Sequence, residues 1–175
     1  MQFLSVENAS KSYGEKSLFR NVTFSVSKGE RIALIAKNGS GKTTLLKVIA
    51  GMEGVEGENA RITINKNIRT AFLPQDPELH PTAMVIDEIL ESDHPVVNAV
   101  KLYRHAMESG NEDAMQKAMT HMDTHHAWDA EAQLEVVLNN LKIDHLENTI
   151  NKKKKKKKKR VALAKVILSQ PDFLI

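Results

Sequence analysis

The chain has 175 residues, with 25 Lys plus Arg against 22 Asp plus Glu, a formal net charge of +3, and 41% hydrophobic residues. This length fits one ordinary globular domain, or most of one. A charged fraction of 27% with 5% aromatic residues argues against a disordered tail, a collagen-like repeat and an aromatic-rich β-sandwich. A water-soluble α/β fold remains.

The chain contains no cysteine, which removes disulfide frameworks, thiolate metal sites and cysteine nucleophiles. A reducing cytosol fits this composition, and we expect a cytoplasmic protein. No basic segment followed by a long apolar stretch marks a secretory signal at the amino terminus. The longest apolar stretches, such as 32–36 and 161–164, fall far short of the ~18 residues that a membrane span needs. We therefore expect no direct membrane insertion.

The first third of the chain has the pattern of strands joined by short turns. Residues 3–7 and 22–26 alternate apolar and polar side chains around a turn-like segment at 12–14, which predicts an antiparallel, half-exposed pair. Residues 31–35 contain a continuous apolar run, which predicts a buried strand of a parallel sheet. A glycine-rich loop follows, and apolar residues at helical spacing then predict a helix over 43–49 with a C-cap at Gly51.

The glycine-rich loop, residues 36–43, reads Ala-Lys-Asn-Gly-Ser-Gly-Lys-Thr and follows the P-loop pattern G-x-x-x-x-G-K-[ST] except at its first position. Gly39 and Gly41 lack a Cβ, so the backbone can aim consecutive N–H groups at phosphate oxygens, aided by the dipole of the next helix. Lys42 is placed to reach the β- and γ-phosphates, and the Thr43 hydroxyl to ligate Mg²⁺. If the first position needs a positive φ, alanine there costs about 1 kcal/mol and loosens the loop. The alternative is an ordinary glycine-rich turn.

In this context the chain resembles the ATP-binding cassette (ABC) ATPases over nearly its whole length. The resemblance implies ATP and Mg²⁺ as cofactors and ATP hydrolysis as the family's activity. It implies an α/β P-loop NTPase fold with an antiparallel β subdomain, a partial RecA-like parallel-sheet core and a helical subdomain. We expect one cassette domain over 1–175, divided into the β subdomain with the P-loop core (1–80), the helical subdomain (81–150) and the signature region with the following helix and the start of the Walker B strand (151–175).

The resemblance assigns nucleotide-binding roles to nine residues and metal-binding roles to two of them, Thr43 and Gln75. Tyr13 resembles the family's A-loop aromatic residue, which stacks on adenine; the alternative is a turn tyrosine packed on the sheet. Gln75 follows the predicted strand 70–73, 33 positions after Lys42, and resembles the Q-loop glutamine, which reaches Mg²⁺ or the attacking water. The full nucleotide-binding set is Tyr13, Asn38, Gly39, Ser40, Gly41, Lys42, Thr43, Thr44 and Gln75.

The family's signature loop, Leu-Ser-Gly-Gly-Gln, is expected at 153–157, before a helix that begins at Arg160. All five positions are lysine, within an unbroken run over 152–159, and undoing them would change the net charge from +3 to −2. We hypothesise an engineered or mis-recorded segment; natural degeneration is the alternative. In this family the signature of one cassette closes over ATP held by another, so we expect ATP-driven pairing to be lost while single-site nucleotide binding survives weakly.

Residues 171–175 resemble the opening of the family's Walker B strand. Asp172 precedes the strand in this register, and we interpret it as a cap or turn residue. The 175 residues do not reach the family's Walker B Asp, its catalytic Glu or its switch-loop His. The resemblance therefore assigns no catalytic residue here and predicts slow or absent hydrolysis.

The segment between Gln75 and the lysine run predicts a helical subdomain longer than transporter ATPases usually have. Helical spacing occurs over 85–90, 96–107, 113–128 and 130–141, and the acidic residues within 87–91 are expected on an exposed helix face. The stretch from Trp128 to Leu141 resembles soluble ABC-F proteins, particularly the Uup-like branch. That branch carries two cassettes in tandem, lacks membrane domains and acts on ribosomes or nucleic acid. The chain would then be most of the first cassette, with the second cassette as its partner.

Two alternative functions remain open. An ATP-binding subunit of an ABC transporter would need a membrane partner docked on the helical subdomain. A non-catalytic polybasic nucleic-acid-binding module would owe its activity to residues 152–159, and would bind RNA with a steep salt dependence unaffected by ATP.

Overall fold

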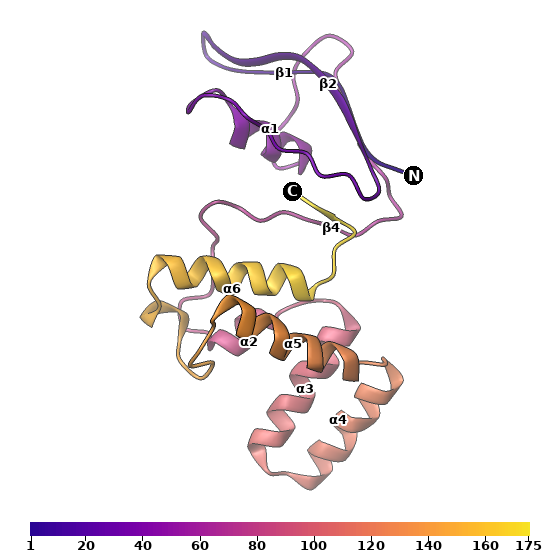
Figure 1. Cartoon of the computed structure of the whole chain (residues 1–175), viewed down its shortest axis with the longest axis vertical. Coiled ribbons are helices and arrows are strands. Elements are labelled where there is room, and N and C mark those ends of the chain that lie inside the picture. Colours follow the sequence, from indigo (N-terminus) through magenta and orange to yellow (C-terminus); the bar gives the residue numbers. More distant parts are fainter. The chain divides into compact units, whose positions relative to one another are not determined.

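The computed structural model describes residues 1–175, with the side chain of Lys152 left out. The chain divides into two compact units, which Figure 1 traces by sequence colour. Unit 1 comprises Met1–Phe72 with Asp172–Ile175, and unit 2 comprises Leu73–Pro171. Unit 1 holds the strands and one helix, whereas the described elements of unit 2 are all helical.

The main sheet of unit 1 is an antiparallel hairpin with one added strand. β1 (Gln2–Tyr13) pairs with β2 (Lys16–Ser27) on one side and with β3 (Arg61–Ile64) on the other. Gly14, in the tight turn between β1 and β2, has φ +56°. The buried apolar face of the sheet packs on α1. The predicted antiparallel, half-exposed pair is confirmed, with strands longer than expected.

Helix α1 (Lys42–Ile49) confirms the helix predicted after the glycine loop. It buries Leu45, Val48 and Ile49 on one side, as the apolar spacing indicated. At its end the Gly51 N–H donates to the Val48 carbonyl at 3.1 Å, and the Met52 N–H donates to the Lys47 carbonyl at 2.9 Å. These two bonds form a Schellman motif in which Ala50 is the C-cap and Gly51, with φ +74°, is the residue after it.

The buried strand predicted over 31–35 is wrong. This segment has no regular structure, and Ile35 is 93% exposed. β4 (Thr70–Ala71) and β5 (Phe173–Leu174) pair in parallel with each other, and neither pairs with 31–35 in the part of the chain that the structure describes. A strand satisfies its backbone groups only beside a partner, so an apolar run alone does not form one. The parallel sheet of the described residues is therefore the β4–β5 pair.

Unit 2 is helical and has its own core, and its bounds, 73–171, are wider than the 81–150 predicted for a helical subdomain. Its helices are α2 (Val85–Ile89), α3 (Pro95–Ser109), α4 (Glu112–Thr124), α5 (Trp128–Leu141), the 3₁₀ turn η1 (Ile150–Lys152) and α6 (Lys155–Leu168). α3 and α4 form an antiparallel hairpin, and α6 packs on α2 and α5 (Figure 1). Ile89, Val100, Met122, Leu134 and Val161 are almost fully buried where these helices meet. No helix among the described residues is long and apolar enough to span a membrane.

The single helix predicted over 113–128 is wrong, because α4 ends at Thr124. His126 has φ +50°, and the Ala127 N–H donates to the Met122 carbonyl at 2.9 Å. This is again a Schellman motif, and Ala127, the second residue after the C-cap, is buried. The residue with positive φ is a histidine and not glycine, so the sequence carries no glycine to mark the break.

The last helix begins earlier than predicted, at Lys155 instead of Arg160. Lysine has a good helix propensity, and the run contains no glycine that would keep the backbone irregular. Positions that carry the signature loop in the resembling family are therefore partly helical in this chain.

Candidate functional site

The glycine loop that precedes α1 has the backbone that sequence analysis required. Gly39 has φ +79° and Gly41 has φ +88°, both in the region that favours glycine. A Cβ on Gly41 would lie 2.8 Å from the Cβ of Leu18 and 3.2 Å from Cδ1 of Phe19, so a larger residue does not fit. Ala36 is outside the positive-φ region. The free-energy cost considered for alanine at that position therefore does not arise.

The start of α1 offers unsatisfied hydrogen-bonding groups. Its N-cap is Gly41, and no side chain caps the first turn. The Ser40 hydroxyl oxygen is buried without a hydrogen-bond partner in the described part of the chain. Lys42 Nζ donates to the carbonyls of Ala36 at 2.6 Å and Lys37 at 2.8 Å, which keeps the ammonium over the loop. A phosphate group supplies the acceptors and the negative charge that these groups lack, so the loop fits a nucleotide.

Three further residues of the predicted nucleotide-binding set lie in or just before the first turn of α1. Thr43 is exposed in the first helical turn, and Thr44 follows it, half-buried. Asn38 is exposed in the loop. A hydroxyl beside a phosphate group is a suitable Mg²⁺ ligand, and the metal role of Thr43 stays a prediction.

Tyr13, the last residue of β1, lies beside the same helix. Its hydroxyl donates to Glu53 Oε2 at 2.5 Å, and this hydrogen bond raises the pKa of the phenol, with burial as a smaller cause. The hydroxyl of Thr44 also interacts with the phenol and lowers its pKa slightly. Tyr13 is 53% exposed and stays outside the apolar core. The structure therefore brings Tyr13 and Thr44 together within unit 1.

Two other residues singled out from the sequence are Gln75 and Asp172. Gln75 is exposed and belongs to unit 2, so its role at the metal stays a prediction. Asp172 lies directly before β5, where its carboxylate accepts the Arg69 N–H at 2.8 Å. The interpretation that Asp172 precedes the strand is confirmed.

An acidic cluster in unit 2 differs from the exposed helix face that we expected. Glu88 is only 1% exposed, and its carboxylate accepts hydrogen bonds from the backbone N–H of His80 and from Lys165 Nζ, both at 2.9 Å. Burial raises the pKa of Glu88, but these hydrogen bonds outweigh it, and the pKa lies below its ordinary value. No sequence pattern indicates the Lys165 contact, which joins residues 77 positions apart.

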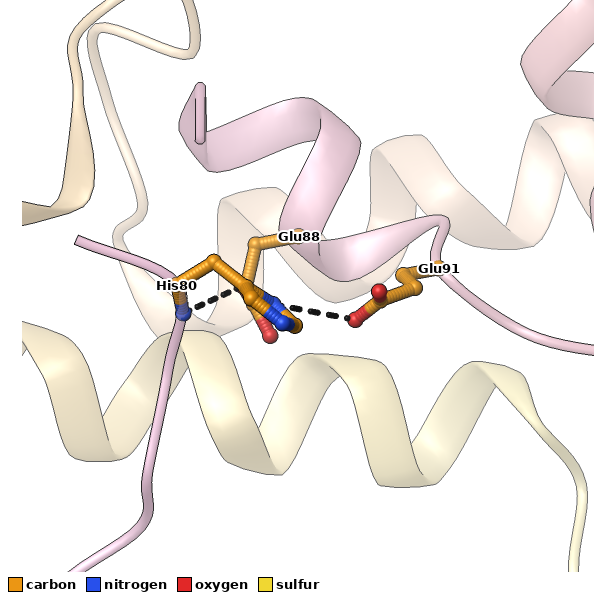
Figure 2. Close-up of side chains that lie close together, drawn as sticks. All are labelled: His80, Glu88 and Glu91. Carbon is orange, nitrogen blue, oxygen red and sulfur yellow. Dashed lines mark hydrogen bonds and ion pairs between the residues drawn. The ribbon is translucent and has the colours of Figure 1, made fainter. Parts of the chain in front are cut away.

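The residues of this cluster lie close enough together to hold a metal ion, but a lysine already balances their negative charge. Figure 2 shows the His80 ring between Glu88 and Glu91, and the possible ligand atoms of these three residues lie within 4.8 Å of one another. Lys165 Nζ lies 2.9 Å from Glu88 and 2.6 Å from Glu91. The ammonium thus already supplies the positive charge that a cation would bring, and the cluster is an ion-pair network that joins α2 to α6.

The lysine run is only partly neutralised. Lys155 Nζ lies 2.8 Å from Asp76, and Lys157 Nζ lies 2.8 Å from Asp144. These contacts lower the pKa of both aspartates. Lys153 Nζ donates only to the backbone carbonyls of Asp144 and His145. Within the described residues, three members of the run make neither an ion pair nor a side-chain hydrogen bond: Lys154, Lys156 and Lys158. The run also borders a shallow groove of about 340 Å³ beside Asp76 and Pro77.

Comparison with known proteins identifies the family. The family model described as ABC transporter matches residues 19–175. The chain belongs to the ABC transporter family. It is therefore an ATP-binding cassette domain, and the P-loop NTPase fold predicted from the sequence is confirmed.

Several curated relatives match the cassette over most of its length. The uncharacterized ABC transporter ATP-binding protein YfmR of Bacillus subtilis is 37% identical over 183 aligned positions, covering the whole chain and 29% of YfmR. The energy-dependent translational throttle protein EttA of Escherichia coli K12 is 29% identical over 92% of the chain and 30% of EttA. The ribosome protection protein VmlR of B. subtilis is 37% identical over 53% of the chain and 16% of VmlR. The cassette spans less than a third of each of these relatives.

Solved structures agree on the fold. An ATP-binding subunit of an ABC transporter matches 97% of the cassette and 63% of that chain, with a TM-score of 0.63 and 24% identity. An ATP-binding protein of Pyrococcus furiosus matches 94% of the cassette and 70% of that chain, with a TM-score of 0.61 and 20% identity.

Proposed function

We propose that the cassette binds Mg·ATP through its P-loop and belongs to an ABC-F-type ATPase that acts on the ribosome or on nucleic acid. The observation that carries the nucleotide-binding part is the start of α1. Two glycines with positive φ lead into an uncapped helix, beside the buried, unpartnered hydroxyl of Ser40. Backbone donors, the helix dipole and Lys42 all favour an anion at this end of the helix.

Each residue of the set has a chemical role in this proposal. Lys42 neutralises phosphate charge, while backbone and side-chain donors over 38–44 bind phosphate oxygens. Thr43 and Gln75 ligate Mg²⁺, and Tyr13 stacks on adenine. ATP hydrolysis is the family's activity. That the 175 residues alone hydrolyse ATP slowly or not at all stays a prediction, as does their organisation as a single cassette domain.

The ABC-F assignment is supported by the relatives. EttA is a translational throttle protein and VmlR a ribosome protection protein, and both match the cassette. We infer a cytoplasmic parent protein of the Uup-like kind, with a second cassette in tandem and the ribosome or nucleic acid as target. A gene that encodes one cassette beside membrane components would favour the transporter subunit instead.

Titration calorimetry with Mg·ATP tests the nucleotide site through Lys42→Ala. We expect the variant to weaken binding at least tenfold, about 1.4 kcal/mol, because it removes the charge nearest the phosphates. Lys28→Ala, which removes an exposed lysine of unit 1, is the matched control and should bind as the unaltered chain does. Equal affinity of Lys42→Ala and the unaltered chain would refute the proposal.

A second candidate function, RNA binding by the lysine run, is favoured by the three described lysines whose ammonium groups make neither an ion pair nor a hydrogen bond. Neutralising three phosphates of a single strand predicts a slope of about −2 for the logarithm of affinity against the logarithm of salt concentration. The run contains no aromatic residue for base stacking, so binding should be insensitive to sequence.

Filter binding of oligouridylate at several salt concentrations tests this candidate. The test variant replaces the three lysines that make neither an ion pair nor a side-chain hydrogen bond: Lys154→Gln, Lys156→Gln and Lys158→Gln. The control removes the same charge from exposed lysines of unit 1: Lys16→Gln, Lys28→Gln and Lys66→Gln. We expect only the test variant to flatten the salt slope, and ATP to have no effect. Similar slopes in the two triple variants would mean that net charge alone attracts RNA.

A further inference from the structure

The loop that follows α1 is fastened to the end of β1. Ser10 and Glu56 exchange backbone hydrogen bonds of 2.7 and 2.9 Å. The Glu56 carboxylate accepts the Ser12 N–H at 2.9 Å and pairs with Lys11 Nζ at 2.9 Å. The backbone on the N-terminal side of Tyr13 is therefore held by a segment more than 40 positions away.

The Tyr13 side chain is held separately, at its hydroxyl. The hydroxyl donates to Glu53 Oε2 at 2.5 Å, and the other carboxylate oxygen of Glu53 lies 3.6 Å from Lys47 Nζ on α1. The Glu53 side chain is 23% exposed and Tyr13 is 53% exposed, so this hydrogen bond lies at the surface. Glu53 thus links the phenol to the helix that begins at the P-loop.

The Tyr13 ring stays accessible although its hydroxyl is fixed. About half of the residue is exposed, and Lys11 Nζ lies over one face of the ring, 5.9 Å from its centroid. A side chain with two χ angles loses little further entropy on stacking when its far end is already bonded. The ring is therefore pre-organised for a planar ligand.

We propose that Glu53 is a positioning residue, which holds the Tyr13 ring in the orientation that stacks on the adenine of ATP. This inference rests on the proposed function, because it takes Tyr13 as the adenine platform. It adds a role for a residue that touches neither phosphate nor base. Glu53 should affect affinity for the base while leaving affinity for the phosphates unchanged.

Calorimetry of the 175-residue chain with two ligands, Mg·ATP and magnesium tripolyphosphate, separates these contributions. Tyr13→Ala should weaken ATP binding about tenfold, in line with base–aromatic stacking. Tyr13→Phe and Glu53→Ala should each weaken it about threefold, and the double variant no further, because both remove the same hydrogen bond. Glu53→Gln keeps an acceptor oxygen and should restore most of the affinity. Tripolyphosphate should bind all these variants equally.

Glu58→Ala, in the same loop and exposed, is the matched control and should change neither affinity. The inference is overturned if Glu53→Ala leaves ATP binding unchanged, or if it weakens both ligands equally, since the latter is loss of loop structure. Tripolyphosphate binding that is insensitive to Lys42→Ala would instead refute the P-loop proposal. A chain that binds neither ligand overturns both.

Discussion

At the scale of single residues, the buried Glu88 carboxylate is the charged group for which the loss of one partner should destabilise the protein most. A buried charge costs several kcal/mol unless a partner compensates it. Glu88 has its compensation from Lys165 Nζ and from the His80 backbone and ring, whereas Glu91, bound by the same lysine, is half exposed. One lysine therefore pairs with a buried and an exposed carboxylate, so the contributions of the two carboxylates to stability can be compared.

We predict that Lys165→Met destabilises the protein by about 3 kcal/mol at pH 7, because it leaves the Glu88 charge buried with only His80 as partner. Glu91→Ala removes the exposed member of the network and should cost less than about 1 kcal/mol. Urea denaturation followed by circular dichroism at 222 nm, which reports the helices of unit 2, measures both. Equal losses for the two variants would contradict this account of Glu88.

The pH dependence of the same pair has a definite sign. The pKa of Glu88 is lowered in the folded protein. Its contribution to the free energy of unfolding is therefore fully present above the ordinary pKa of about 4.5, and it is lost as the pH falls through the pKa of the folded state. In Lys165→Met burial dominates and raises that pKa, so the variant loses stability as the pH rises. Lowering the pH from 7 to 5 should therefore reduce the difference in the free energy of unfolding between the variant and the unaltered chain.

At the scale of elements, the sequence predicted what is determined locally. The β1–β2 hairpin and α1 follow from alternation, helical spacing and the glycines at their ends. The P-loop was equally predictable because its residues are contiguous, and its backbone conformation depends on Gly39 and Gly41.

Elements that depend on distant partners were not predictable in this way. In the part of the chain that the structure describes, the apolar segment 31–35 has no strand beside it. The end of α4 is a local feature, but it depends on a histidine with positive φ, and no glycine marks it in the sequence. The start of α6 shifted because lysines, unlike glycines, extend a helix. The polar pairs Tyr13–Glu53 and Glu88–Lys165 join residues 40 and 77 positions apart, and such pairs leave no periodic pattern in a sequence.

At the scale of the whole molecule, the lysine run affects how two copies of the chain can associate. It places positive charge at the positive end of the α6 dipole, and Asp76 and Asp144 offset only part of it. A glycine-rich loop would let backbone N–H groups approach a phosphate closely, whereas long lysine side chains keep the backbone away and repel a second run. Association through this end of α6 should therefore be unfavourable.

We predict that Mg·ATP leaves the mass of the chain in solution unchanged, measured by multi-angle light scattering. The comparison variant restores the family's signature: Lys153→Leu, Lys154→Ser, Lys155→Gly, Lys156→Gly and Lys157→Gln. It should move toward a dimer when ATP is added, because it removes ten like charges from the paired surfaces and frees the backbone donors at the start of α6. Adding Lys42→Ala to this variant should abolish the response, since pairing needs bound nucleotide. An ATP-dependent dimer of the unaltered chain would contradict the prediction, as it would mean that lysines substitute for the signature.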